Sequence, residues 1–237
     1  MTRSAFFPPS FLFAPDAQVD AMSKRFLLSF LLLFVSTAAW ASSPSPALVA
    51  GTDYEVIENG QPFDPLASKI EVVEVFGYWC HVCAEFQPLV DAWKRKLPKD
   101  VRFTYVPLEA TAGDQFARGY YAAKSTGVLA STHNAVFVAV HAQQTLPKNP
   151  TADELAAFYI SRGAIAKKFN AALQSAATTA SVKRAREFAL RSNVPGTPTV
   201  VINGKYRVLG RSLQDMLRIT NALIAQRRLE QGHAPRR

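Results

Sequence analysis

Two cysteines stand three positions apart in the segment Cys80-His81-Val82-Cys83, and the chain of 237 residues contains no others. At the start of a helix this C-x-x-C spacing brings the two residues within disulfide range, so the bond can open and close without moving the fold. The unpaired amides of the helix start favour a thiolate on Cys80. Because a stabilised thiolate favours the reduced protein over its disulfide, such a pair oxidises other thiols. A structural disulfide or half of a metal site are the alternatives.

The residue types around this pair limit the chemistry further. When protonated, His81 would add positive charge near the Cys80 sulfur. The alternative is that the His81 ring faces solvent and only affects access to the Cys80 sulfur. Two cysteines exclude a four-thiolate zinc site and a disulfide-dense scaffold, and four scattered histidines leave little for a structural metal site. We therefore expect no metal.

The cysteines lie between a predicted strand and a predicted helix. Residues 69–76 (KIEVVEVF) are rich in β-branched side chains and predict a buried strand, which Glu74 interrupts. Residues 84–97 carry apolar side chains at helical spacing, and Pro88 is expected to kink that helix. Residues 101–108 predict a second strand.

An Ala-rich stretch from about residue 112 to 191 predicts a helical subdomain. Its helical segments are residues 116–125, 132–143, 151–162 and 165–190, the last with room for a break. Thr151 and Glu154 form a capping-box pattern. Beyond this block, strand patterns flank an Asn203-Gly204 turn, in which glycine supplies a positive φ, and a final helix is expected over residues 213–229. Residues 54–57 suggest a short leading strand.

Thr197-Pro198 is the second local feature that suggests function. A proline after Gly-Thr at the entry of an apolar strand is a candidate for a cis peptide bond. A cis bond would leave the carbonyl and amide of Thr197 pointing outward, where they can pair with an extended substrate chain.

The approach FGYWC, the C-x-x-C pair, the helical block and the segment VPGTPTVVINGKYRV together resemble the DsbA family of periplasmic thiol-disulfide oxidoreductases, over about residues 50–226. This resemblance implies an α/β, thioredoxin-like fold with an inserted helical subdomain. We place the first part of the thioredoxin-like domain at 50–111, the insertion at 112–191 and the second part at 192–230. The resemblance implies that Cys80 attacks and carries the mixed disulfide, that Cys83 is its buried partner, and that Thr197-Pro198 faces them.

Glu74, six residues before Cys80, matches the family's buried acid below the active site. Apolar neighbours on both sides favour burial over an exposed position on an edge strand. Desolvation should then raise its pKa, which suits a role in proton movement during thiol exchange. The chain departs from the family in carrying His81 one position early and Gln87 in place of a familiar acid, so its oxidising strength stays open; we assign no role to Gln87 or Glu85.

The N-terminal region predicts export. The apolar run 26–35 follows a basic flank and precedes Ala39-Trp40-Ala41, as in a secretory signal peptide over residues 22–41 that is cleaved after Ala41. Met22 is then the expected start, with residues 1–21 as an upstream leader; an uncleaved anchor is the alternative. Export places the thiol pair in an oxidising compartment, by resemblance the periplasm. It also argues against nucleic acid as the partner of this basic chain, whose formal charge is +9.

The leading hypothesis is a protein dithiol oxidase that introduces disulfides into exported proteins. Its substrates would be reduced or unfolded exported proteins, and a membrane quinone-linked partner of the DsbB type would reoxidise it. No organic cofactor is expected, because the cysteine pair itself carries the electrons, and a monomer is expected. The alternatives are a periplasmic reductase or isomerase; a copper-binding carrier that uses Cys80, Cys83 and His81; and a binding module with a structural disulfide and an exposed apolar approach at Phe76, Tyr78 and Trp79.

Overall fold

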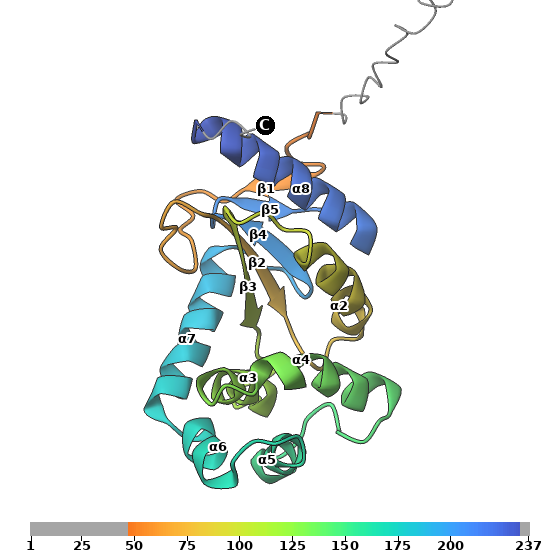
Figure 1. Cartoon of the computed structure of the whole chain (residues 1–237). Coiled ribbons are helices and arrows are strands. Elements are labelled where there is room, and N and C mark those ends of the chain that lie inside the picture. Colours follow the sequence, from red (N-terminus) through yellow and green to blue (C-terminus); the bar gives the residue numbers. More distant parts are fainter. Residues whose placement is uncertain (1–46, 233–237) are drawn as a thin grey trace, which may run out of the picture. The chain divides into compact units, whose positions relative to one another are not determined.

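A five-stranded mixed sheet lies at the centre of the computed structural model, which describes residues 47–232 (Figure 1). The predicted signal peptide, the upstream leader and the start at Met22 fall outside these residues. No helix among the described residues is long and apolar enough to cross a membrane.

The strand order is β1-β5-β4-β2-β3. The interior strand β2 runs parallel to β3 and antiparallel to β4, and all of its residues are buried, which confirms the predicted buried strand. The strands are β1 (Tyr54–Val56), β2 (Ile70–Phe76), β3 (Val101–Pro107), β4 (Thr199–Ile202) and β5 (Tyr206–Val208).

Helices α2 (His81–Lys94) and α8 (Leu213–Glu230) share one apolar core with the sheet. Side chains of β2 alternate between the two faces, so Val72 belongs to this core whereas Val73 belongs to the core formed with the helical block. The C-x-x-C pair therefore stands where the predicted strand meets the predicted helix, and α2 begins directly after Cys80.

The chain between β3 and β4 is helical, and Figure 1 shows this block at the end of the sheet from which β2 enters α2. The capping box of Thr151 and Glu154 is confirmed, and the long segment predicted over residues 165–190 is broken between α6 and α7. The helix predicted to start at residue 132 begins at Leu129 instead and ends in a π-helical turn. The elements are α3 (Gln115–Ser125), α4 (Leu129–Phe137), η1 (Val138–Ala142), α5 (Ala152–Ile160), α6 (Ala166–Leu173) and α7 (Ala176–Arg191).

The predicted Asn203-Gly204 turn joins β4 to β5. Both residues have positive φ, 51° and 65°, as the tight hairpin turn requires. Glycine is needed at position 204 for a second reason, since a Cβ there would lie 2.0 Å from the carbonyl oxygen of Gln61. The Asn203 side chain also accepts a hydrogen bond of 2.7 Å from the amide of Glu71, which ties the hairpin to β2.

Candidate active site

Cys80 is held at the N-cap of α2 by the short connection from β2. Gly77 leaves room for the indole of Trp79, because a Cβ at position 77 would lie 2.5 Å from that ring. The indole N–H of Trp79 donates to the carbonyl of Leu108 at 3.4 Å, which links this connection to the end of β3. The connection thus places Cys80 beyond the carboxyl end of β2, at the first turn of α2.

Both cysteines are free thiols in this structure. The Cys80 sulfur accepts the backbone N–H of Cys83 at 3.2 Å, and its thiol donates to the carbonyl of Thr197 at 3.3 Å. Cys80 keeps 7% of its surface exposed, whereas Cys83 is fully buried. Only one of the two sulfurs is therefore open to a thiolate from outside.

The environments of the two thiols push their pKa values apart. A hydrogen bond from the Cys83 thiol to the Cys80 sulfur, supported by the Thr197 hydroxyl and the amides of Cys83 and Val82, lowers the pKa of Cys80 to about 6 against the opposing effect of burial. Burial raises the pKa of Cys83 far above its ordinary value, and the neighbouring Cys80 raises it further. At neutral pH Cys80 is thus the thiolate and Cys83 the thiol.

Thr197, which precedes Pro198, lies against the Cys80 sulfur although it is 117 residues away from Cys80 in the chain. Their peptide bond is cis. The Thr197 hydroxyl is buried and has no partner within the described chain other than the Cys80 sulfur. It is available as a donor to the ionised Cys80 sulfur.

Glu74 lies on the interior strand β2, where it is paired with Tyr105 in β3 and Val200 in β4. Its predicted burial is confirmed, with 1% of the residue exposed. Neither carboxylate oxygen has a hydrogen-bond partner among residues 47–232. Desolvation raises the pKa of Glu74 to about 8, so the carboxyl is protonated at neutral pH.

His81 lies on the exposed side of α2. Its ring nitrogen is 3.1 Å from Glu85, and its side chain is 68% exposed. The groups that lower the pKa of Cys80 are hydrogen-bond donors and do not include His81. Of the two roles considered for His81, this position agrees with a ring that faces solvent.

A buried polar cluster that local sequence patterns do not predict joins α2, α4 and β3. His133 from α4 contacts the Tyr78 hydroxyl at 2.7 Å through Nδ1 and the Gln87 side-chain oxygen at 3.2 Å through Nε2. The Gln87 amide nitrogen donates in turn to the Tyr105 hydroxyl at 2.9 Å and to Asn134 at 2.9 Å. Desolvation lowers the pKa of His133 to about 3, so the ring is neutral, and the amide oxygen fixes the proton on Nε2.

Local patterns in the sequence contained one signal for this cluster, the position of Gln87 in the active-site helix. His133 gave none, because its neighbours Thr132 and Asn134 are polar and do not mark a buried site, and its hydrogen-bond partners are 46 and 55 positions away in the chain. The apolar residues Phe76 and Tyr78 before the cysteines belong to the core, since they are 0% and 1% exposed. The binding-module alternative required these side chains to be exposed, and for these two residues that expectation is wrong.

Between residues 47 and 232, no group of three or more His, Cys, Asp or Glu side chains is arranged to hold a metal ion.

Comparisons with known proteins match most of the described chain. A family model described as Thioredoxin matches residues 65–221. The thiol:disulfide interchange protein DsbA of Burkholderia cepacia is 35% identical over 185 residues, which cover 76% of this chain and 85% of that protein. The same-named protein of Pseudomonas aeruginosa strain UCBPP-PA14 is 33% identical and covers 78% of this chain and 86% of its own length.

Solved structures agree with these relatives. The crystal structure of the oxidoreductase DsbA from Xylella fastidiosa has a TM-score of 0.73 and 44% identity, covering 77% of this chain and 98% of that one. The crystal structure of Pseudomonas aeruginosa DsbA has a TM-score of 0.70 and 32% identity, covering 78% and 97%. These matches confirm the predicted thioredoxin-like α/β fold.

Proposed function

The chain belongs to the DsbA family and is a thiol:disulfide oxidoreductase, and from that premise we propose that it donates the Cys80–Cys83 disulfide to other proteins. The observation that carries this proposal is the asymmetry of the two thiols: Cys80 is accessible with its pKa lowered to about 6, whereas Cys83 is buried with its pKa raised. A reduced form with a stabilised thiolate makes the disulfide the less stable state, so electrons flow from the substrate to the enzyme.

The exchange occurs in two displacements. A substrate thiolate attacks the Cys80 sulfur, the Cys80–Cys83 bond breaks, and Cys83 leaves with the electron pair and takes up a proton. A second substrate thiolate then attacks the substrate sulfur of the mixed disulfide, and Cys80 leaves as a thiolate. The substrate loses two electrons and two protons. Both electrons go to the cysteine sulfurs, one proton stays on Cys83, and the other proton is released. Thr197 supports the leaving Cys80 thiolate through its hydroxyl.

Glu74 is proposed to exchange protons with the buried thiol. Cys83 has no route to solvent through its own surface, because the residue is fully buried. Glu74 is protonated at neutral pH and its charge is coupled to that of Cys80, so it is an acid of suitable strength close to the pair.

The setting of the reaction is also a proposal. The signal-peptide pattern over residues 22–41 and the family support a periplasmic enzyme, a monomer, that acts on reduced or unfolded exported proteins. A membrane partner of the DsbB type, linked to quinones, would return the dithiol to the disulfide. The cysteine pair carries the electrons, so the proposal includes no organic cofactor.

Trapping of the mixed disulfide tests the assignment of Cys80. The variant C83S, incubated with an oxidised peptide disulfide, should accumulate a covalent adduct on Cys80 that mass spectrometry of tryptic fragments locates. The matched variant C80S should form little adduct, because its remaining thiol is buried and not ionised. Equal adduct formation by the two variants would refute the assignment.

The reduction potential tests the direction of electron flow. The pair is equilibrated with glutathione buffers of increasing ratio, and thiols are trapped at each point. We expect a potential above that of the reductase thioredoxin, which is about −270 mV. A potential as low as that of structural disulfides, below about −300 mV, would exclude the donor role and favour a reductase.

A further inference from the structure

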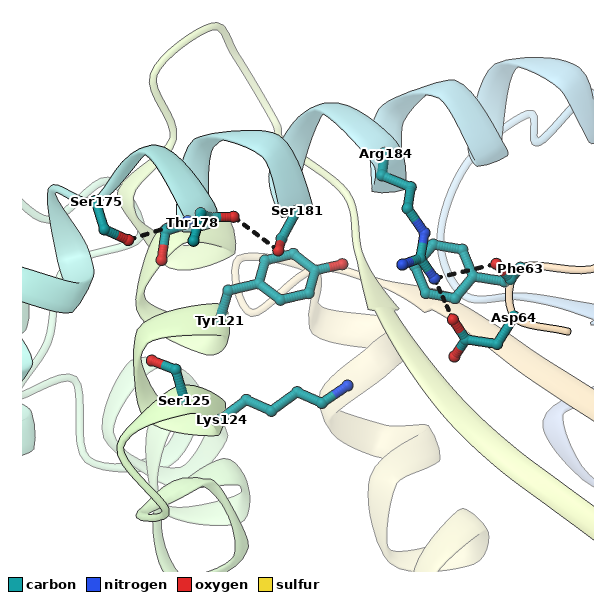
Figure 2. A pocket seen from close by; sticks show the side chains of 10 residues that line it. Phe63, Asp64, Tyr121, Lys124, Ser125, Ser175, Thr178, Ser181 and Arg184 are labelled. Carbon is teal, nitrogen blue, oxygen red and sulfur yellow. Dashed lines mark hydrogen bonds and ion pairs between the residues drawn. The ribbon is translucent and has the colours of Figure 1, made fainter.

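A pocket that is lined by neither cysteine lies between α3 and the first half of α7 (Figure 2). Its volume is about 310 Å³, and none of the residues assigned to thiol exchange lines it. Pockets that hold small molecules begin at about 300 Å³, so the space suits a ligand the size of one sugar ring.

Tyr121 contributes a hydroxyl that lacks a partner. The residue is 8% exposed, and its hydroxyl oxygen is buried without a hydrogen bond to any residue between 47 and 232. Figure 2 shows the hydroxyl end of Tyr121 directed along the pocket toward the side where Arg184 lies. A buried phenol that makes no hydrogen bond costs free energy, unless a ligand supplies the missing partner.

Positive charge gathers around this hydroxyl. Lys124 is exposed, forms no ion pair within the described chain, and extends in Figure 2 in the same direction as the Tyr121 ring. Arg184 donates to the carbonyl of Phe63 at 3.0 Å and pairs with Asp64, so the charges of Arg184 and Asp64 offset each other. The charge of Lys124 remains uncompensated in the pocket.

The start of α7 forms another part of the pocket wall. Ser175 caps the helix, and Ala177 in its first turn lines the pocket. First-turn amides have no acceptor within their own helix, and the helix dipole places partial positive charge there. Figure 2 shows Ser175 at the opposite side of the pocket from the one toward which Lys124 and the Tyr121 hydroxyl point, so the donors for an oxyanion are Lys124 and Tyr121.

The serines on the wall offer the opposite chemistry. Ser125 donates its hydroxyl proton to the carbonyl of Ala122 at 3.0 Å, and Ser181 donates to the carbonyl of Ala177 at 2.9 Å. The hydroxyl protons of both serines are therefore already engaged in hydrogen bonds to the backbone, whereas the lone pairs of both oxygens can accept hydrogen bonds from a ligand. A ligand that fits both sets of groups carries an oxyanion and several hydroxyls.

We propose that this pocket binds a small polyhydroxylated oxyanion, such as a sugar acid or a sugar phosphate, with the anionic group at Lys124 and Tyr121 and the hydroxyls at Ser125 and Ser181. A carboxylate and a phosphate share the chemistry that Lys124 and Tyr121 recognise, so both are tested.

The experiment titrates the whole protein with glucuronate, glucose 6-phosphate, neutral glucose and inorganic phosphate, observed through backbone amide chemical shifts. We expect saturable shifts at Tyr121 and Ala177 with at least one of the two hydroxylated anions, and weaker binding of glucose and of phosphate alone. The preference between glucuronate and glucose 6-phosphate identifies the anionic group. No binding by either anion, or equally tight binding of glucose or inorganic phosphate, would overturn the proposal.

Variants locate the site. Lys124→Met should weaken binding about tenfold or more, and Tyr121→Phe about fivefold, as expected for losing a charged and a neutral hydrogen bond. Lys183→Met is the matched control, because Lys183 is exposed on α7, pairs with Glu187 and does not line the pocket. Lys183→Met should bind as the unmodified protein does, and all three variants should keep their rate of thiol exchange. Equal weakening by Lys124→Met and Lys183→Met would mean attraction by net charge alone and would overturn the site.

Discussion

Replacing Glu74 by glutamine should stabilise the protein at neutral pH and remove part of its pH dependence. In the unfolded chain this carboxyl has a pKa near 4.5, whereas desolvation raises it to about 8 in the fold. Between these two values the unfolded chain has lost a proton that the folded protein still holds. The free energy of unfolding therefore falls as the pH rises through this window and levels off above about pH 8.

The size of the effect follows from the two pKa values. Each unit of difference corresponds to about 1.4 kcal/mol. The proton that Glu74 keeps in the fold but loses on unfolding therefore costs about 3 kcal/mol of stability at pH 7, and the buried carboxylate costs about 5 kcal/mol above pH 9. A glutamine cannot ionise. The stability of Glu74→Gln relative to the unmodified protein should therefore rise by about 3 kcal/mol between pH 4.5 and pH 7, whatever constant offset the buried amide adds.

Glu71 on the same strand provides the matched comparison. It is also fully buried, but its carboxylate accepts the amides of Phe63 and Asp64 at 2.7 and 2.9 Å and pairs with Arg102 at 2.7 Å. Glu71→Gln removes the charge that these donors stabilise and should destabilise the fold at pH 7 by about 3 kcal/mol. Two identical substitutions three residues apart should therefore have opposite signs.

The assay is urea unfolding of the reduced protein, followed by far-ultraviolet circular dichroism from pH 4.5 to 9. All other titrating groups are common to the two proteins, so the difference between Glu74→Gln and the unmodified chain isolates Glu74. A constant difference across this range would show that Glu74 is not desolvated in the fold, and the reasoning would be refuted.

Three further predictions concern the surroundings of the thiols. Thr197→Val removes the hydroxyl that supports the Cys80 thiolate, so the pKa of Cys80 should rise from about 6 by roughly one unit in an ultraviolet thiolate titration; an unchanged midpoint would exclude this contact. His133→Phe leaves the Tyr78 hydroxyl and the Gln87 oxygen without their partner and should cost about 2–4 kcal/mol in urea unfolding at pH 8. At pH 5 the cost should be smaller by about 2 kcal/mol, because the ring, whose pKa is lowered from 6.5 to about 3 in the fold, takes up a proton only on unfolding; an equal loss at both pH values would contradict that lowered pKa. Gly77→Ala should displace the Trp79 ring and change its fluorescence, whereas Gly196→Ala, where a Cβ meets no atom within 4 Å, should leave it unchanged; identical spectra for both would count against the packing at Gly77.

The strand–thiol–helix unit and the hairpin could be predicted from the sequence because their determinants are local. The β-branched run of β2, the helix that begins after Cys80 and the positive-φ turn at Asn203-Gly204 each depend on a few neighbouring residues. The break within residues 165–190 was predictable for the same reason, whereas the start of α4 was placed three residues late because its N-cap, Val128, makes no side-chain capping bond.

The sequence by itself thus determined where the candidate residues for thiol chemistry lie, since a C-x-x-C pair and a Thr-Pro strand entry are local patterns. Only the tertiary structure decided how those residues behave. It brings the Thr197 carbonyl to Cys80 across 117 positions and surrounds Gln87 with Tyr105 and His133. It also separates Glu71, which is buried with partners, from Glu74, which is buried without them. Desolvation and hydrogen bonding depend on every atom packed around a group, and in this fold those atoms come from segments far apart in the chain.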